Sequence, residues 1–154
     1  MKVFGKGVVL FFATGAGSGY APVMPGTVGS AVGIPLYMVL AGLPLLWYGV
    51  VVAVCIFAAI WLSSRAERYF GRNDPPQIVI DEVCGLLVTL IGLPATWYTV
   101  AAGFLIFRIL DVLKPFPANR INNHLHGGAG IVLDDIVAGV YANALLHCVR
   151  FLPQ

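Results

Sequence analysis

The stretch that decides the fold is residues 31–62, AVGIPLYMVLAGLPLLWYGVVVAVCIFAAIWL, which carries no charged side chain. One continuous helix over this stretch would be about 48 Å long at about 1.5 Å per residue, whereas the hydrocarbon core of a bilayer is about 30 Å thick. Gly42-Leu43-Pro44 lies in its central part, and glycine with proline is typical of a turn. The stretch therefore predicts a helical hairpin in a membrane, roughly residues 28–42 and 45–62.

The composition of the whole chain also indicates a membrane protein. Of its 154 residues, 59% are hydrophobic and 10% are charged, whereas soluble domains carry about 25% charged residues. This composition excludes a disordered chain and argues against a soluble globular domain, and the length predicts a single domain over residues 1–154. The net charge is only +2 and no basic block is interleaved with aromatic residues, so no nucleic-acid partner is predicted. The three cysteines are widely spaced in apolar sequence and indicate neither a disulfide framework nor a zinc site.

Three further segments complete the predicted bundle. Residues 8–13 are apolar but too short to span, so they are interpreted as interfacial or re-entrant. Residues 78–107 form either one long helix, kinked at Gly92-Leu93-Pro94, or a second hairpin. The hairpin puts eight of the nine Lys and Arg residues on one side of the membrane, as the positive-inside rule favours. With a last helix at about 131–151, the predicted fold class is an all-α membrane protein: a compact bundle of about five short transmembrane helices with a cytoplasmic N-terminus.

In this topology five of the seven acidic residues lie at the cytoplasmic ends of three helices: Asp81, Glu82, Asp111, Asp134 and Asp135. A charged residue in hydrocarbon costs about 2.5–3.5 kcal/mol on insertion scales, so acids at this level usually pair with cations or serve a function. Arg108 and Lys114 flank Asp111 at helical spacing, but two bases do not balance five acids. Oxygen ligands favour a hard divalent cation, and the sequence predicts Mg²⁺ held by these five carboxylates. Residues 63–76 are interpreted as a polar loop that either follows the second helix directly or starts as an extension of it. Glu67 and Asp74, in this segment, are interpreted as interfacial charges.

Two glycine-rich segments lie at the same predicted level and offer backbone amides for an anion. The first comprises Gly26, Thr27, Gly29 and Ser30, and the second runs from His126 through Gly127 to Gly130. Both precede predicted helices, where free N–H groups bind phosphate. Thr27, Ser30, Arg108, Lys114, His126 and Gly127 are therefore the candidate substrate-binding residues. Gly85 and Gly139, each four residues after an acid, either let helices pack closely or leave room for a headgroup.

Several of these stretches, in this order, make the chain resemble the phosphatidylglycerophosphatase A family. The resemblance rests on Gly17–Gly19, Pro25–Ser30, Asp81-Glu82 with Gly85, Ala101–Phe104, Phe107–Asp111, Lys114–Pro117, His126–Ile131 and Asp134–Gly139. It implies a magnesium-dependent enzyme of phospholipid biosynthesis in the bacterial inner membrane, multi-pass, with its active site at the cytoplasmic face. The implied reaction removes the terminal phosphate of phosphatidylglycerophosphate and yields phosphatidylglycerol and inorganic phosphate.

Several alternatives stay open at this stage. A small membrane transporter or channel with a cation site at its cytoplasmic end would also place acids in helices, although it would spread them through the bilayer. The attacking group is either water activated by the metal or a carboxylate that forms an acyl-phosphate. The sequence does not decide between one and two metal ions, between Asp134 and Asp135 as ligand, or among oligomeric states.

Overall fold

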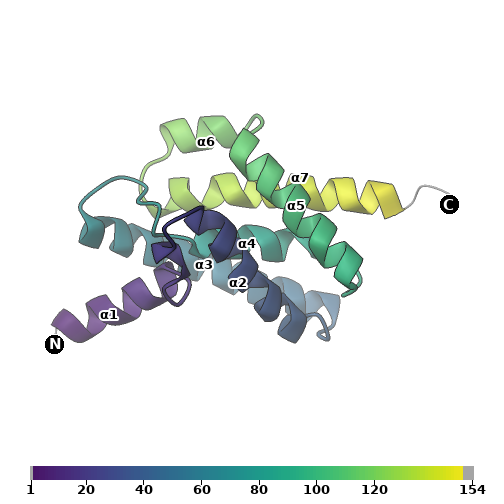
Figure 1. Cartoon of the computed structure of the whole chain (residues 1–154), viewed down its shortest axis with the longest axis horizontal. Helices are drawn as coiled ribbons and strands as arrows, with labels where there is room; N and C mark the ends of the chain where they lie inside the picture. The colour runs from purple at the N-terminus through teal and green to yellow at the C-terminus, as the bar shows by residue number, and fades with distance from the viewer. Residues whose placement is uncertain (1, 151–154) are drawn as a thin grey trace.

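The computed structural model describes residues 2–150, and within them the side chains of residues 5–121 and 124–149. This part of the chain contains helices and no strand, which confirms the all-α class (Figure 1). The elements are α1 (Lys2–Ala13), a 3-10 turn η1 (Ser18–Tyr20), α2 (Pro25–Leu40), α3 (Leu45–Phe70), α4 (Ile80–Thr89), α5 (Trp97–Leu113), α6 (Ala118–His124) and α7 (Gly128–Arg150).

Both predicted hairpins are present. α2 and α3 are joined across Gly42-Leu43-Pro44, and α4 and α5 across Gly92-Leu93-Pro94, so residues 78–107 do not form one kinked helix. The two turns lie at the same end of the molecule, because the Tyr37 hydroxyl near the end of α2 donates a hydrogen bond to the Leu93 carbonyl oxygen at 3.1 Å. His147, near the end of α7, also reaches this end and bonds the Ile91 carbonyl oxygen at 3.1 Å.

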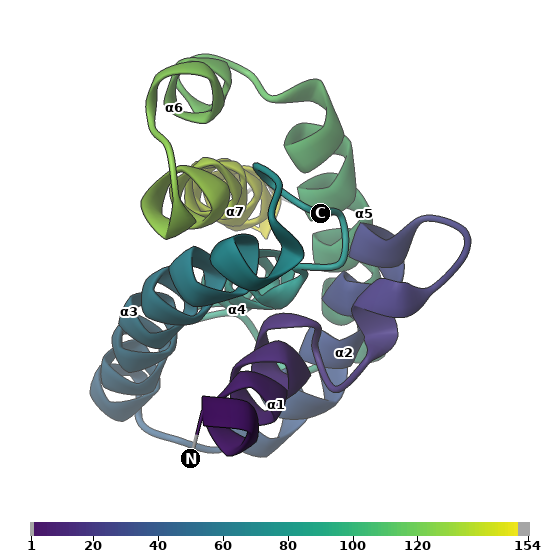
Figure 2. The same ribbon diagram turned by 90° about the vertical axis from the view of Figure 1, so that its left-hand side faces the viewer.

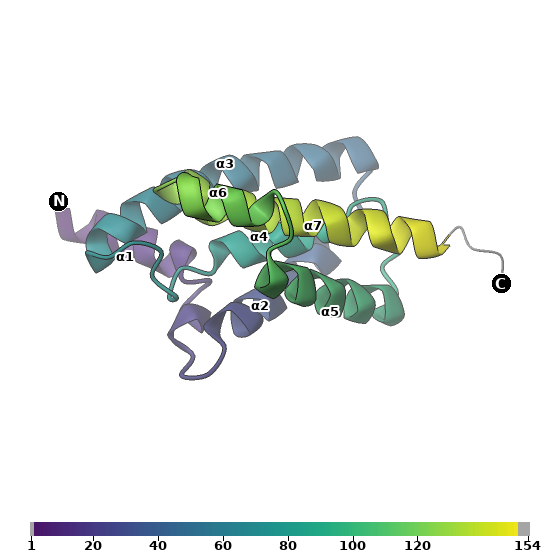
Figure 3. The same ribbon diagram turned by 90° about the horizontal axis from the view of Figure 1, so that it is seen from above.

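Several predicted boundaries were wrong. α3 continues to Phe70 rather than ending near residue 62, because no helix breaker occurs before Gly71, whose left-handed backbone (φ 68°) caps the helix. The polar segment at 63–76 therefore starts as an extension of this helix, which was one of its two interpretations, and the loop begins at Gly71. α2 begins at Pro25 and α7 at Gly128, so both glycine-rich segments lie largely inside first helical turns. The short helix α6 lies between the predicted hairpin at 78–107 and the predicted last helix, where the sequence predicted no helix, and it packs against α7 (Figure 3).

α4 is the centre of the bundle and contacts α2, α3, α5 and α7 (Figure 2). Its residues from Val83 to Thr89 are all buried. Glycines let α7 approach α4 closely: a Cβ on Gly139 would lie 2.5 Å from the Gly85 carbonyl oxygen, and one on Gly85 would lie 3.0 Å from the Asp135 carbonyl oxygen. This close crossing confirms the packing interpretation of the two glycines, and it brings the acids one turn earlier in each helix together.

Two helices, α3 and α7, are long and apolar enough to cross a membrane, and α2 is a shorter apolar helix. α3 exposes large apolar side chains along its length, such as Trp47, Val54 and Phe57, each at least 60% exposed. An apolar face of this kind on a helix of 26 residues is suited to lipid rather than water. The number of five transmembrane helices and the interfacial position of α1 remain predictions.

Candidate active site

Three helices bring the five predicted carboxylates to one region of the bundle. Asp81 and Glu82 lie in the first turn of α4, Asp111 lies in the last turn of α5, and Asp134 and Asp135 lie in the second turn of α7. Four of the five are buried, with Asp134 and Asp135 only 3% exposed. Glu82 is mostly buried, because only 14% of its side chain is exposed. The local cause is the hairpin turn between α4 and α5 together with the glycine crossing of α4 and α7.

The tightest group within this region is formed by Asp81, Glu82 and Asp135, hereafter the carboxylate trio. One oxygen from each of the three lies within 4.8 Å of the others. The carboxyl group of Asp111 also lies close enough to Asp135 to interact with it electrostatically. Four acidic side chains from three helices therefore meet at one point.

The trio has oxygens that hydrogen bonding leaves unsatisfied. Asp81 Oδ1, Glu82 Oε2 and Asp135 Oδ2 are buried and accept no hydrogen bond from the part of the chain that the structure describes. Burying charged oxygens without a partner is costly, and buried charges are normally paired or bound to a metal. Three oxygens from three carboxylates at this spacing match the ligands that a hard divalent cation prefers, so the trio could hold a metal ion.

Arg108 binds the edge of this acidic group. Its Nη1 lies 2.5 Å from Asp111 Oδ2 and 4.0 Å from Glu82 Oε1. The same nitrogen donates to the Ser30 hydroxyl at 3.4 Å. α2 contributes to the site at closest range through Gly26, since a Cβ there would lie 2.2 Å from Glu82 Oε1 and 3.2 Å from Arg108 Nη2. The guanidinium therefore connects α2, α4 and α5 at the site.

Lys114 pairs with a different acid from the one its spacing suggested. Lys114 is the left-handed cap of α5 (φ 44°, ψ 61°), so it leaves the helix face of Asp111. Its ammonium group forms an ion pair with Asp134, on α7. Burial disfavours the charged form, but the hydrogen bond to Asp134 and the charges of Asp134, Asp135 and Asp111 outweigh it and raise the pKa of Lys114. The structure thus separates the two neighbouring aspartates: Asp135 belongs to the trio, and Asp134 pairs with Lys114.

The two glycine-rich segments have different surroundings. Ser30 is buried beside Arg108, and its hydroxyl donates to the Gly26 carbonyl oxygen at 2.8 Å. Thr27 lies in the first turn of α2, and its buried hydroxyl has no hydrogen-bond partner. His126 and Gly127 instead line a cavity of about 180 Å³ together with Glu67 and Asp74. None of the carboxylate trio lines that cavity, so the structure does not bring the second segment into the trio.

Asp74 is the residue whose position the sequence did not predict. Its backbone is left-handed (φ 43°), and its N–H donates to Glu67 Oε1 at 3.3 Å. Desolvation raises the pKa of Asp74, the charge of Lys114 opposes this, and the charges of Asp134, Glu67 and Asp111 add to it. Asp74 is exposed, as an interfacial charge is, and its carboxyl group also interacts electrostatically with Lys114 and Asp134, which the sequence did not predict. The turn sequence Asn73-Asp74-Pro75 was the available signal for a specific local conformation.

The fold and the site together define an α-helical protein with apolar helices suited to contact with lipid and with a buried acidic centre beside an arginine. The chain belongs to the phosphatidylglycerophosphatase A family, because the model of that family matches residues 11–150. It is 43% identical over 136 residues to phosphatidylglycerophosphatase A of Escherichia coli (strain K12), covering 88% of this chain and 79% of the relative.

Two further relatives cover similar shares. A Bacteroides thetaiotaomicron protein named "Putative phosphatidylinositol-3-phosphatase" is 37% identical, over 93% of this chain and 94% of its own. Phosphatidylglycerophosphatase A of Haemophilus influenzae is 33% identical, over 90% of this chain and 86% of its own. No solved structure matches the chain significantly. The names of the relatives share one chemistry, the removal of phosphate from a lipid.

Proposed function

We propose that this protein is a phosphatidylglycerophosphatase, which hydrolyses the terminal phosphate of phosphatidylglycerophosphate to phosphatidylglycerol and inorganic phosphate. Membership of the family and the relatives from E. coli and H. influenzae support this activity. The single structural observation that carries it is the carboxylate trio with its unsatisfied buried oxygens beside Arg108.

The metal in this proposal is Mg²⁺, held by Asp81, Glu82 and Asp135, with Asp111 as a further ligand. The metal would neutralise charge on the phosphate and activate water for attack at phosphorus. Oxygen-only ligands and a phosphate substrate favour magnesium among the hard cations. Asp134 supports the site from outside the trio by holding Lys114.

The side chains around the trio supply the remaining functions. Arg108 offers a planar donor pair suited to two phosphate oxygens, and its contacts with Asp111 and Ser30 hold it in position. Lys114 adds positive charge at the end of α5, where it pairs with Asp134 of α7. The Thr27 hydroxyl and the first amides of α2 provide donors for the same anion. His126 and Gly127, beside Glu67 and Asp74, are proposed to contact the glycerol part of the headgroup.

The phosphorus is attacked either by water or by a carboxylate that forms an acyl-phosphate. Trapping of an intermediate distinguishes the two routes. Acid-quenched protein incubated with ³²P-labelled substrate should carry covalently bound phosphate, released by hydroxylamine, only if a carboxylate attacks, and should carry none if water attacks directly.

We further propose that the protein lies in the bacterial inner membrane with the site at the cytoplasmic face. The clustering of Lys and Arg and the common end of the two hairpin turns support this orientation. Single cysteines at residues 63–76 and 115–128 of a cysteine-free variant should both resist an impermeant maleimide in intact cells. Reaction at either loop in intact cells would contradict the topology.

Phosphate release from lipid vesicles tests the activity itself. Purified protein should release phosphate from phosphatidylglycerophosphate with Mg²⁺ and lose this activity in excess chelator. Phosphatidylinositol 3-phosphate in identical vesicles is the competing substrate, because one relative bears that name. Faster hydrolysis of the inositol lipid would overturn the substrate assignment, and absence of phosphate release from either lipid would overturn the proposed function.

A further inference from the structure

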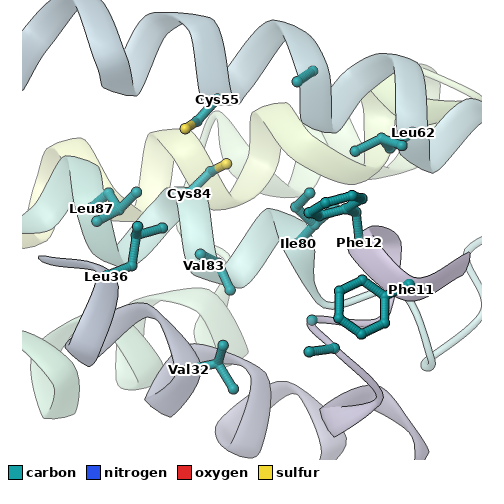
Figure 4. A pocket seen from close by; sticks show the side chains of 13 residues that line it. Phe11, Phe12, Val32, Leu36, Cys55, Leu62, Ile80, Val83, Cys84 and Leu87 are labelled. Carbon is teal, nitrogen blue, oxygen red and sulfur yellow. The ribbon is translucent and has the colours of Figure 1, made fainter. Parts of the chain in front are cut away.

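A second cavity lies on the opposite side of α4 from the carboxylate trio. It has a volume of about 370 Å³ and lies among α1, α2, α3 and α4 (Figure 4). Ile80, Val83, Cys84 and Leu87 line it from α4. At about 100° per residue these four side chains share one helix face, and Asp81 and Glu82 point away from it. α4 thus separates a charged site from a hydrocarbon-lined one.

The lining of this cavity is apolar throughout. Phe11 and Phe12 close it from α1, and Val32 and Leu36 line it from α2 (Figure 4). The thiols of Cys55 and Cys84 are the only side-chain heteroatoms in its lining. Apolar cavities of this kind exclude water and take up hydrocarbon. A sugar, a phosphate or a metal ion would find no partner here.

Room for a ligand is provided by small side chains. Gly15, Ala16 and Ala58 all line the cavity, where larger residues would fill it. Gly15 has a left-handed backbone (φ +53°), and a Cβ there would lie 2.7 Å from Ser18 Oγ and 3.0 Å from Val79, so a larger residue would be strained at this position. The cavity is therefore kept open by backbone geometry as well as by residue size.

The cavity and the charged site are adjacent. Cys84 lines the cavity, and the next residue, Gly85, packs so closely on α7 that its Cβ would lie 3.0 Å from the Asp135 carbonyl oxygen. The two sites are therefore about one helix width apart. A phosphorylated glycerolipid has the same arrangement, with a charged headgroup and acyl chains attached to one short glycerol unit.

We propose that this cavity binds an acyl chain of the lipid whose phosphate enters the carboxylate trio. The assignment rests on the proposed function and adds to it a binding site for the hydrophobic part of the substrate. The enzyme then selects a lipid phosphate over a water-soluble phosphate ester. For a short-chain substrate dissolved as monomers in water, each methylene that enters the cavity contributes about a fourfold gain in kcat/KM, until the cavity is full.

Filling the cavity tests this assignment. Ala58 lies on α3, lines the cavity and is exposed, so Ala58→Phe adds bulk there without entering the core. Ala53→Phe is the matched control on the same helix, at an exposed position outside the cavity lining. We expect Ala58→Phe to lower kcat/KM at least tenfold on long-chain phosphatidylglycerophosphate in mixed micelles at constant surface concentration. Activity on the deacylated, water-soluble phosphate ester should stay unchanged, and Ala53→Phe should resemble wild type on both.

Thiol protection gives a readout that does not depend on turnover. Cys55 lines the cavity, whereas the exposed Cys148 lies on α7 away from it. A non-hydrolysable phosphonate analogue of the lipid should slow alkylation of Cys55 at least fivefold and leave Cys148 unaffected. Phosphatidylcholine with the same acyl chains should protect much less. Equal protection by phosphatidylcholine would show that bulk lipid occupies the cavity and would overturn the proposal.

The outcomes separate this inference from the proposed function. Wild-type protein that hydrolyses neither the lipid nor the deacylated ester contradicts the proposed function. A second outcome contradicts the acyl-chain site alone. In that outcome wild-type protein hydrolyses the lipid, Ala58→Phe and Ala53→Phe behave alike, and the analogue does not protect Cys55. If Ala58→Phe loses activity on both substrates, the protection of Cys55 in the wild-type protein decides.

Discussion

Gly26→Ala is the smallest change that reaches the proposed metal ligands. Gly26 is the second residue of α2, and the Cβ of an alanine there would lie 2.2 Å from Glu82 Oε1. Real Cβ atoms essentially never approach another heavy atom closer than 3.0 Å, so the carboxylate must move by at least about 0.8 Å. Because the clash is with the end of a flexible side chain, the backbone can stay in place.

This displacement predicts a large loss of activity with no loss of stability. Misplacing a catalytic group by about 1 Å can cost about 100-fold in rate, which corresponds to about 2.7 kcal/mol of transition-state stabilisation. Replacing a helical glycine by alanine at a compatible position instead stabilises the fold by about 0.4–1 kcal/mol. Gly26→Ala should therefore lower kcat about 100-fold while its Tm is equal to or above that of wild type.

The assay is phosphate release from phosphatidylglycerophosphate vesicles, with thermal unfolding of the same samples. Gly49→Ala is the matched control, because Gly49 lies in α3 and a Cβ there would meet nothing within 4 Å. Its kcat should equal that of wild type. Full activity of Gly26→Ala would refute the assignment of Glu82 to the catalytic site.

Three further predictions concern single side chains. Asp111→Asn should lower kcat at least 100-fold in the vesicle assay. Glu67→Gln, outside the trio, is the control and should change kcat less than threefold. Full activity of Asp111→Asn would remove Asp111 from the site. Arg108→Lys should cost about 2 kcal/mol in kcat/KM, because lysine lacks the planar donor pair; near-wild-type kinetics would leave Arg108 only as the ion-pair partner of Asp111. The raised pKa of Asp74 means that the wild-type fold loses stability as pH rises through the unfolded and then the folded pKa of this group. The difference in Tm between Asp74→Asn and wild type should therefore shift in favour of the variant when the pH is raised from acid to neutral. An equal Tm difference at both pH values would contradict the raised pKa of Asp74.

Local sequence signals predicted most of the fold. Gly42-Leu43-Pro44 and Gly92-Leu93-Pro94 break the apolar stretches where the structure has its turns, because glycine and proline act on the backbone at their own positions. The end of α3 could not be fixed from the sequence, because the charges after Leu62 are compatible with a loop as well as with an extension of the helix. Charged residues with good helix propensity continue a helix until a breaker such as Gly71 occurs.

The site was predicted as a group of residues but not as a geometry. The positions of the charged residues along the helices predicted that the acids lie at one depth in the membrane. The close crossing of α4 and α7, which brings the acids together, depends on Gly85 and Gly139. Pairings between distant segments could not be read from spacing. Lys114 shares a helical repeat with Asp111, yet its left-handed backbone directs it to Asp134. The cavity behind α4 also depends on four helices and has no local sequence signature.

The central claim is that Asp81, Glu82 and Asp135 bind a divalent cation. Mn²⁺, a spectroscopic substitute for Mg²⁺ with similar oxygen ligands, allows bound and free metal to be counted by electron paramagnetic resonance. The account predicts saturable Mn²⁺ binding by the wild-type protein and at least tenfold weaker binding by the Asp81→Asn/Asp135→Asn variant, with unchanged helix content. Wild-type protein that leaves all Mn²⁺ free, or a double variant that binds it equally well, would contradict the account.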